Sequence, residues 1–200
     1  MIDPSIFKSY DIRGTYPDQL DEAGAEAIAR AFAKVVGAKT VVVGKDVRAS
    51  GPALAAAAIG ALRRAGVTVI DIGTVSTDMF YYASATLDVD GGFTISASHN
   101  PKNWNGFNCC RRGAVPLSLT SGLDQIRDLA LADVGNAGNA GGAATPGGYV
   151  TRDVWPEFAD YVLTYIDRSL IRPMHIVANG NCGLQVKALR LVAERGQLPL

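Results

Sequence analysis

The sequence predicts an α/β fold in which helices pack on a largely parallel β-sheet. The prediction rests on two observations: short apolar runs suited to buried strands alternate with segments of helical periodicity, and the connections between them are short. The strand-like segments are residues 39–44, 67–73, 92–96 and 174–178. The helix-like segments are residues 21–36, 52–65, 77–85, 119–132, 155–166 and 183–194.

The termini of the first helices carry recognisable signals. The segment 21–36 has apolar residues at helical spacing and is followed by Gly37, which suits a C-cap. A valine-rich strand at 39–44 comes next. Pro52 then opens the second helix and Gly66 follows its end, the usual asymmetry between the two ends of a helix.

The same alternation continues further along the chain. A β-branched strand at 67–73 is followed by a short helix at 77–85 and a strand at 92–96. The helices at 119–132 and 155–166 come later, the second with Tyr161, Val162 and Tyr165 as its expected apolar face.

Three regions follow from this order of elements. Residues 1–134 are expected to form one complete domain. Residues 135–170 start with a Gly- and Ala-rich run and continue into a linker helix. Residues 171–200 contain one strand and one helix without partner strands, so the chain is expected to stop inside a second domain of the same kind.

Composition restricts the class of protein. The chain has 200 residues, of which 48% are hydrophobic and 19% charged, as in a globular protein with one good core. Nineteen basic residues balance nineteen acidic ones. Because there is no net charge to attract polyanions, neither nucleic acid nor a membrane surface is an expected partner. The oligomeric state is left open.

The cysteines and the N-terminus favour a cytoplasmic protein. Cys109, Cys110 and Cys182 are an odd number with one adjacent pair, which is no disulfide framework, and they show no CxxC spacing. The N-terminus is charged where a signal peptide needs an apolar run, and no apolar run is long enough to span a bilayer.

Two polar clusters follow strand ends. Residues 44–48 follow one predicted strand and residues 97–100 another. Ligands of open α/β sheets gather at the carboxyl ends of the strands, so both clusters are expected to face one crevice. Ser98 and His99 are neighbours in sequence, which argues against a hydrolase triad, since triad partners come from distant positions.

A phosphoserine at Ser98 suits these surroundings better. It would carry about −1.5 to −2 charges and need cations nearby. The cations available in Gly- or Pro-punctuated loops are Arg13, Lys45, Arg48 and Lys102. The alternative is that residues 100–101 only start a turn that His99 caps, and the residue types alone leave both interpretations open.

The motifs narrow the choice. YDIRG at 10–14, GKDVRAS at 44–50, SASHNP at 96–101 and NG at 105–106 occur in this order. In this the chain resembles the α-D-phosphohexomutase superfamily, most closely its bacterial phosphomannomutase/phosphoglucomutase branch. The resemblance extends from Phe7 to about Leu131 and continues more weakly to residue 181.

The resemblance implies a fold and an activity. The fold would be a three-layer α/β/α domain with a mixed, largely parallel sheet, followed by the first βα unit of a second, similar domain. The activity would be that of an isomerase, a phosphomannomutase that interconverts mannose 6-phosphate and mannose 1-phosphate through a phosphoserine and a hexose 1,6-bisphosphate. Glucose phosphates are further candidate substrates, and Mg²⁺ is the expected cofactor.

The resemblance also assigns roles to individual residues. Ser98 would be the nucleophile and phosphate carrier, and in this chain the one Mg²⁺ ligand. Arg13 and Arg48 would stabilise charge on the transferring group, and His99 would support the loop or touch the sugar. The expected substrate-binding residues are Tyr10, Lys45, Asn100 and Lys102.

Two departures from the family pattern weaken the expectation of activity. Asn108 stands where the family usually has a lysine, and a neutral amide cannot act as a general acid or base. The family's DGDxDR metal loop is absent from the sequence. We therefore expect this chain alone to be inactive. Two alternatives remain: a phosphoglucosamine mutase, and a non-catalytic remnant that binds a sugar phosphate or a partner protein.

Overall fold

The computed structural model describes residues 2–134, 145–181 and 183–199. Within these residues a mixed sheet has the strand order β1-β5-β4-β2-β3-β7, with β6 paired to β5. The strands are β1 (Ile12–Thr15), β2 (Thr40–Lys45), β3 (Thr68–Thr74), β4 (Gly91–Ile95), β5 (Trp104–Arg111), β6 (Val115–Pro116) and β7 (Tyr149–Thr151). The pairs β4–β2, β2–β3 and β3–β7 are parallel, whereas β5 is antiparallel to β1, β4 and β6.

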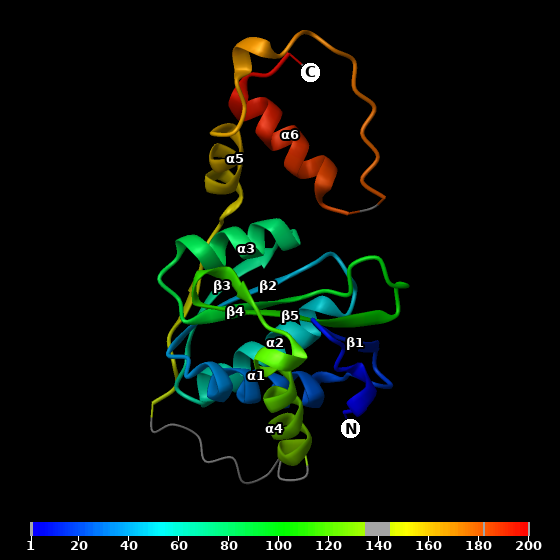
Figure 1. Cartoon of the computed structure of the whole chain (residues 1–200), viewed down its shortest axis with the longest axis vertical. Coiled ribbons are helices and arrows are strands. Elements are labelled where there is room, and N and C mark those ends of the chain that lie inside the picture. Colours follow the sequence, from blue (N-terminus) through cyan, green and yellow to red (C-terminus); the bar gives the residue numbers. More distant parts are fainter. Residues whose placement is uncertain (1, 135–144, 182, 200) are drawn as a thin grey trace.

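Helices cover both faces of this sheet. The longer helices are α1 (Glu22–Val36), α2 (Gly51–Arg64), α3 (Thr77–Thr86), α4 (Asp124–Val134), α5 (Trp155–Leu163) and α6 (Gln185–Gly196). Short helical turns are η1 (Pro4–Ile6), η2 (Arg112–Ala114), η3 (Leu119–Leu123) and η4 (Arg168–Leu170). Helices α1, α2 and α4 lie on one face and α3 on the other, which confirms the three-layer α/β/α arrangement (Figure 1).

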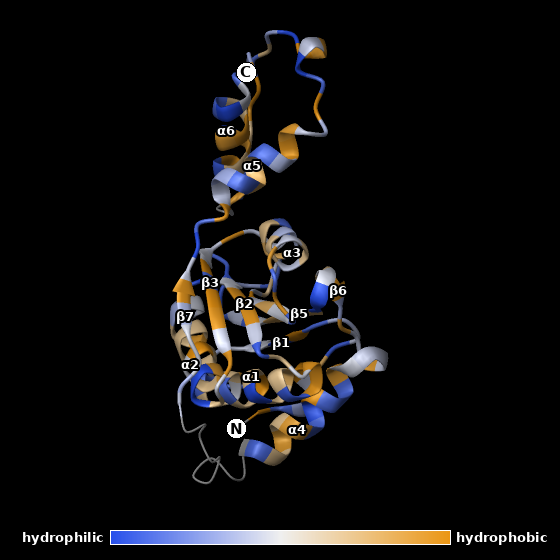
Figure 2. Cartoon of the chain, turned by 90° about the vertical axis from the view of Figure 1, so that its left-hand side faces the viewer, coloured by the Kyte–Doolittle hydropathy of each residue, from blue (hydrophilic) through white to orange (hydrophobic). Residues whose placement is uncertain are grey.

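Local signals account for the ends of α1. The Asp21 side chain accepts a hydrogen bond from the Gly24 N–H at the N-terminus, and Gly37 closes the helix with a left-handed φ of 67°. The apolar face of α1 packs on the sheet (Figure 2). Phe32, Phe93 and Phe107 form a row of edge-to-face contacts there. This confirms the helix predicted at 21–36.

A second apolar cluster lies on the α3 face of the sheet. Val42, Met79 and Phe80 are buried there with Trp155 of α5. Leu184, Ala188 and Leu191, at the start and along one face of α6, pack against the same cluster, and Lys187 Nζ lies 3.9 Å from the centre of the Trp155 ring. The α6 helix is therefore docked on the rest of the molecule through apolar contacts.

The predicted strand at 174–178 is wrong. Residues 171–180 have no regular structure, and Val177 is 99% exposed. A strand is stable only when its N–H and C=O groups pair with a neighbouring strand, and the described residues offer this segment none. Within residues 174–178 the described backbone hydrogen bond is from the Met174 N–H to the Pro199 carbonyl, at 3.1 Å.

Other differences are smaller. The helix predicted at 119–132 begins with an irregular turn, η3, because Ser121 and Gly122 have non-helical backbone angles. The helix predicted at 155–166 ends at Leu163. Strand β7 comes from the region expected to be a linker, and the Gly/Ala-rich run at 135–142 lies outside the described residues. No helix in the described ranges is long and apolar enough to cross a membrane.

Candidate functional site

Strands β2 and β4 end side by side, which brings the two polar clusters together. Lys45 pairs with Ile95 at the last position of each strand, and the Asp46 N–H donates to the Ile95 carbonyl at 3.0 Å. The loop after β2 carries Arg48, and the loop after β4 carries Ser98. We call residues 96–104 the serine loop. Residues 46–48 of the first cluster and 98–100 of the second line one cavity, as expected.

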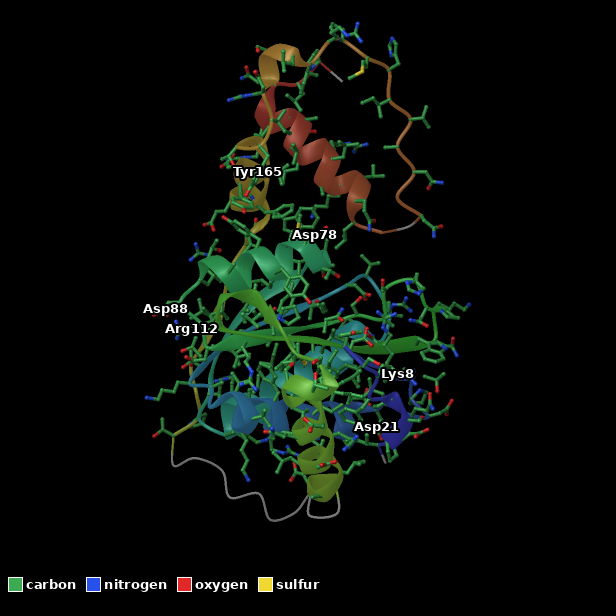
Figure 3. The ribbon with its side chains drawn as sticks, viewed as in Figure 1. Lys8, Asp21, Asp78, Asp88, Arg112 and Tyr165 are labelled. Carbon is green, nitrogen blue, oxygen red and sulfur yellow. The ribbon has the colours of Figure 1, made fainter. Side chains whose placement is uncertain are left out.

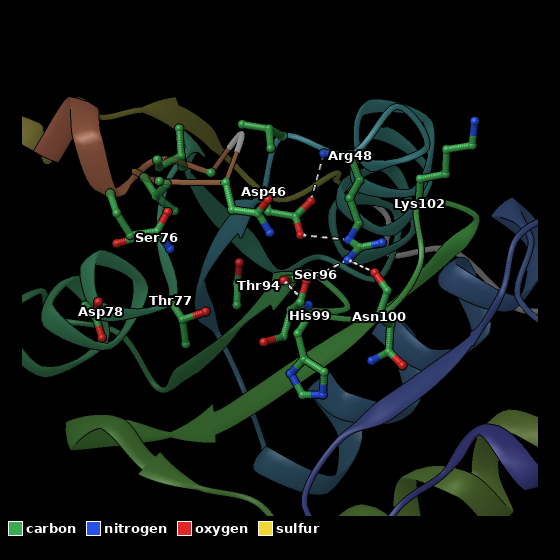
Figure 4. A pocket seen from close by; sticks show the side chains of 18 of the residues that line it. Asp46, Arg48, Ser76, Thr77, Asp78, Thr94, Ser96, His99, Asn100 and Lys102 are labelled. Carbon is green, nitrogen blue, oxygen red and sulfur yellow. Dashed lines mark hydrogen bonds and ion pairs between the residues drawn. The ribbon is translucent and has the colours of Figure 1, made fainter. Parts of the chain in front are cut away.

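This edge of the sheet contains a cavity of about 970 Å³ (Figure 4). Its walls come from the two loops, the N-terminus of α3, and residues 180, 181 and 183–185 near the start of α6. Five of the predicted site residues line it: Arg48, Ser98, His99, Asn100 and Lys102. The described residues that line the cavity do not include Tyr10, Arg13 or Lys45.

Ser98 is exposed and has an unusual backbone. Its φ is 52°, a left-handed conformation that residues with a Cβ seldom adopt. The Ser96 hydroxyl accepts a hydrogen bond from the Ser98 N–H at 3.1 Å, and the Asn100 side-chain amide donates to the Ala97 carbonyl at 2.8 Å. These contacts fold the loop back on itself and leave the Ser98 side chain in the open cavity.

The Arg48 guanidinium donates hydrogen bonds to four backbone carbonyls of the serine loop, which the sequence motifs did not predict. Nη1 donates to the carbonyls of Pro101 at 2.6 Å and Trp104 at 3.0 Å. Nη2 donates to the carbonyls of Ser98 at 2.6 Å and Asn100 at 2.7 Å. Nε lies 3.2 Å from Asp46 Oδ2 (Figure 4). Each of the five guanidinium N–H groups therefore has a protein acceptor.

The predicted site residues Tyr10, Arg13 and Lys45 do not line the cavity. Arg13 in β1 forms an ion pair with Asp11 through Nε at 2.7 Å and Nη2 at 2.6 Å. Tyr10 is 77% exposed. The roles expected for Tyr10, Arg13 and Lys45 stay predictions.

Asn108 and Thr94 face each other across two strands. They are paired residues in β5 and β4, so their side chains lie on the same face of the sheet. Thr94 lines the cavity and is 1% exposed, and its hydroxyl is the buried side-chain group without a hydrogen-bond partner in the described part of the chain. The signal that could have found Thr94 is a polar residue inside an otherwise apolar strand.

The described residues do not form a metal site by themselves. Aspartates, glutamates, histidines and cysteines do not gather there in groups of three or more that could hold an ion. Asp46 lines the cavity, but its carboxylate is engaged with Arg48. The donor set therefore does not fit a complete Mg²⁺ site, and no step of the chemistry below depends on the ion.

The cysteines of β5 do not add a nucleophile. Cys109 and Cys110 are buried, and desolvation raises the pKa of both thiols above the ordinary value. Both therefore remain protonated near neutral pH, and a thiol in this state is a poor nucleophile.

Comparison with known proteins agrees with this architecture. Residues 4–133 match the model of the family described as phosphoglucomutase/phosphomannomutase, alpha/beta/alpha domain I. A crystal structure of a phosphoglucomutase/phosphomannomutase family protein from Burkholderia thailandensis superposes with a TM-score of 0.75 at 33% identity, over 98% of this chain and 43% of that one. A second structure, of a putative phosphomannomutase from Thermus thermophilus, has a TM-score of 0.76 at 24% identity and supports the fold.

Curated relatives give the same family. A protein named "Phosphohexose mutases" from Xanthomonas campestris is 39% identical over 186 residues, and a "Phosphomannomutase" from Vibrio cholerae is 38% identical over 188 residues. These alignments cover 92% and 90% of this chain but only 40% and 39% of the relatives. The chain belongs to the phosphoglucomutase/phosphomannomutase family, and it spans the N-terminal portion, including domain I.

Proposed function

We propose that this chain carries the phosphoserine of a phosphohexomutase and that Ser98 is the residue that accepts the phosphoryl group. One observation carries the proposal: Ser98 is exposed in the cavity at the carboxyl ends of β2 and β4 and holds a left-handed φ of 52°. Strained non-glycine residues of this kind concentrate at functional sites, and this edge of an α/β sheet is where ligands bind.

The chemistry of loading requires a phosphoryl donor, which is a hexose 1,6-bisphosphate. The bond between phosphorus and one ester oxygen of the sugar breaks, and a bond between phosphorus and Ser98 Oγ forms. The proton of the Ser98 hydroxyl ends on the sugar oxygen that leaves, so the products are a phosphoserine and a hexose monophosphate. Phosphoryl transfer of this type depends mainly on positioning and on charge stabilisation.

Lys102 and His99 are the residues best placed to meet the added charge. Both line the cavity within four residues of Ser98 in the chain. Arg13 is held by Asp11 and would have to share its donors to contact a ligand. Asn108 cannot accept or supply a proton in the reaction near neutral pH, although its amide can donate a hydrogen bond.

The substrate class is part of the same proposal. The relatives from Vibrio cholerae and Salmonella typhimurium bear the name phosphomannomutase, which favours mannose 6-phosphate and mannose 1-phosphate, with hexose 1,6-bisphosphate between them. Mg²⁺ bound to the phosphoserine would screen its charge, with its remaining ligands supplied from outside the described residues. These statements concern a whole enzyme, and the chain spans about 40% of the length of the Xanthomonas campestris relative.

Direct loading of the chain tests the proposal. The chain is incubated with glucose 1,6-bisphosphate and Mg²⁺, and intact mass with peptide mapping locates any phosphate. We expect one phosphoryl group on the wild-type peptide that contains Ser98 and none on Ser98→Ala. The control Ser5→Ala removes an exposed serine that is distant in sequence from Ser98, and this variant should be phosphorylated like the wild type. Equal loading of Ser98→Ala would overturn the assignment.

A further inference from the structure

Arg48 joins parts of the chain that are distant in sequence. Its guanidinium binds four backbone carbonyls of the serine loop, at residues 98, 100, 101 and 104, with distances of 2.6 to 3.0 Å. These carbonyls are neutral acceptors, and hydrogen bonds from a charged donor to them are stronger than those between neutral groups. The Arg48 side chain is 11% exposed, so water competes little for these donors.

Asp46 holds the guanidinium in place from the other side. Its carboxylate accepts from Arg48 Nε at 3.2 Å and from the Arg48 backbone N–H at 2.9 Å. The Ser50 hydroxyl, two residues further along, accepts from the Asn105 side-chain amide at 2.8 Å. The segment after β2 therefore binds the serine loop through Arg48 and the start of β5 through Ser50.

This geometry leaves Arg48 no donor for another ligand. Five N–H groups meet five acceptors within the described part of the chain, so a phosphoryl oxygen could bind only by displacing one of them. We infer that Arg48 is a positioning residue: it holds the backbone of the serine loop, and with it Ser98, in the conformation that receives the phosphoryl group. That Arg48 holds the loop backbone follows from the contacts alone, whereas its effect on phosphoryl transfer to Ser98 rests on the proposed function.

The position of the Ser98 carbonyl explains how the effect reaches the reacting residue. Arg48 Nη2 holds this carbonyl at 2.6 Å. A peptide group is planar and trans, so the N–H of His99 in the same peptide points away from Arg48. Arg48 thereby fixes the peptide that follows Ser98, and with it the left-handed backbone of Ser98, which is unfavourable when unsupported.

Lysine cannot replace this contact. A lysine ammonium has three N–H groups on one atom, whereas the four carbonyls are spread over the fork of a planar guanidinium. Arg48→Lys keeps the positive charge but loses the planar fork of N–H donors, so it tests the hydrogen-bond geometry separately from the charge. Arg127→Lys is the matched control, because Arg127 pairs with the adjacent Asp128 on the surface of α4, and this contact touches neither loop.

Proteolysis measures the loop without any reference to activity. Trypsin cleaves after Lys102, which lies inside the serine loop between carbonyls that Arg48 binds. We expect Arg48→Lys to be cut after Lys102 at least about tenfold faster than the wild type, because several charged hydrogen bonds are lost together. Arg127→Lys should be cut at that bond at the wild-type rate. A wild-type rate for Arg48→Lys would overturn the inference.

Loading of Ser98 measures the consequence for chemistry. With glucose 1,6-bisphosphate as donor, Arg48→Lys should lower the maximal rate of Ser98 phosphorylation at least about tenfold and leave the half-saturating donor concentration unchanged. A raised half-saturating concentration with an unchanged maximal rate would show that Arg48 binds the donor, contrary to the inference. If the wild type takes no phosphate while the loop still opens in Arg48→Lys, the proposed function fails and the loop contact stands.

A second variant covers the case in which Arg48→Lys does not fold, judged by near-ultraviolet circular dichroism. Asp46→Asn removes the charge behind Nε and leaves the four carbonyl contacts in place. We expect an intermediate increase in cleavage after Lys102, about threefold, since one charged contact out of five is weakened. A folded Asp46→Asn chain with wild-type cleavage and wild-type loading would contradict the positioning role.

Discussion

Asp90 joins the starting ends of two parallel strands through three donors. Its carboxylate accepts from the N–H of Lys39 at 2.8 Å, the N–H of Thr40 at 3.0 Å and Arg112 Nη2 at 2.7 Å. The backbone hydrogen bonds from Thr40 and Lys39, and then the bond from Arg112, lower the pKa of Asp90 from 3.8 to about 2. The charged form of Asp90 is therefore the one that stabilises the fold.

Acid should remove this contribution. The pKa of Asp90 is lower in the folded chain than in the unfolded one, so the stabilisation is complete above pH 3.8 and disappears as the pH falls towards 2. We expect Asp90→Asn to lower the free energy of unfolding at pH 7 by about 1 kcal/mol, because the side chain is partly exposed and screened. It should also flatten the pH dependence in this range, measured by urea denaturation.

Asp88 provides the control for this experiment. Its carboxylate also binds Arg112, through Nη1 at 2.8 Å, but it is 94% exposed and accepts from no strand N–H in the described contacts (Figure 3). Asp88→Asn should leave both the stability and its acid dependence close to those of the wild type. An Asp90→Asn chain that kept the wild-type acid dependence would contradict the account.

Removal of two buried hydroxyls, those of Thr94 and Ser84, should change the free energy of unfolding in opposite directions. The Thr94 hydroxyl is buried and has no hydrogen-bond partner among the described residues, whereas the Ser84 hydroxyl donates to the Phe80 carbonyl at 2.8 Å. Thr94→Val should raise the free energy of unfolding by about 1 kcal/mol, since an unsatisfied buried hydroxyl is unfavourable. Ser84→Ala should lower it by about 1 kcal/mol. Thermal denaturation of the two variants checks the signs, and a destabilised Thr94→Val would show that this hydroxyl has a partner in solution.

At the scale of elements, β5 is the strand that joins the site to the edge of the sheet. It lies antiparallel between β1 and β4 and is preceded by the serine loop. Gly106 allows this close approach, because a Cβ there would lie 1.8 Å from the Ile12 carbonyl oxygen. The NG motif at 105–106 therefore has a packing reason that is independent of catalysis.

Gly106→Ala should disrupt the pairing of β1 with β5. The clash is with backbone, which cannot move aside as a flexible side chain could, so we expect a loss of about 3 kcal/mol in the free energy of unfolding. Gly51→Ala is the matched control, since its Cβ would meet its nearest neighbour at an ordinary 3.5 Å, and its stability should change by less than about 0.5 kcal/mol. Equal stabilities of the two variants would refute this packing argument.

The elements that the sequence predicted share one property: their signals are local. The strand at 39–44 and the helix at 21–36 have apolar patterns and caps that need no partner to be recognised, and both formed within one or two residues of the expected ends. Strand β7 was missed because three exposed residues carry little pattern. The segment predicted as a strand at 174–178 has a convincing pattern, but the described residues offer it no neighbouring strand to pair with.

The features of the candidate site likewise fall into those that the sequence could predict and those that depend on contacts between distant residues. The meeting of the loops after β2 and β4 followed from the parallel order of the strands, which is a rule of the fold. The contacts of Arg48 could not be foreseen, because its acceptors are backbone carbonyls 50 to 56 residues away that have no signature in sequence. The pairing of Thr94 with Asn108 likewise depends on the register of β4 and β5.

On the scale of the whole molecule, the chain combines a well-packed α/β/α body with a largely exposed segment. Residues 171–180 pair with no strand in the described part of the chain, and Ile176 and Val177 are 49% and 99% exposed. Residues 180, 181 and 183–185 contribute to the lining of the cavity that contains Ser98.

Complete turnover of a hexose phosphate should be absent from the isolated chain. We expect no conversion of mannose 1-phosphate to mannose 6-phosphate above background in a coupled assay, since productive reorientation of a bisphosphate requires contacts that about 40% of the relatives' length does not supply. A full-length relative, such as the Vibrio cholerae protein, serves as the positive control. Robust conversion by the chain alone would contradict this expectation.

The central claim is that Ser98 carries a phosphoryl group and can return it, and discharge of the loaded chain tests this most directly. The chain is loaded with phosphorus-32 from labelled glucose 1,6-bisphosphate, freed of donor and mixed with mannose 6-phosphate. We predict that the label leaves Ser98 and appears in a hexose bisphosphate, and that Ser98→Ala never acquires it. Label that stays on the protein, or that appears only as inorganic phosphate, would contradict the account.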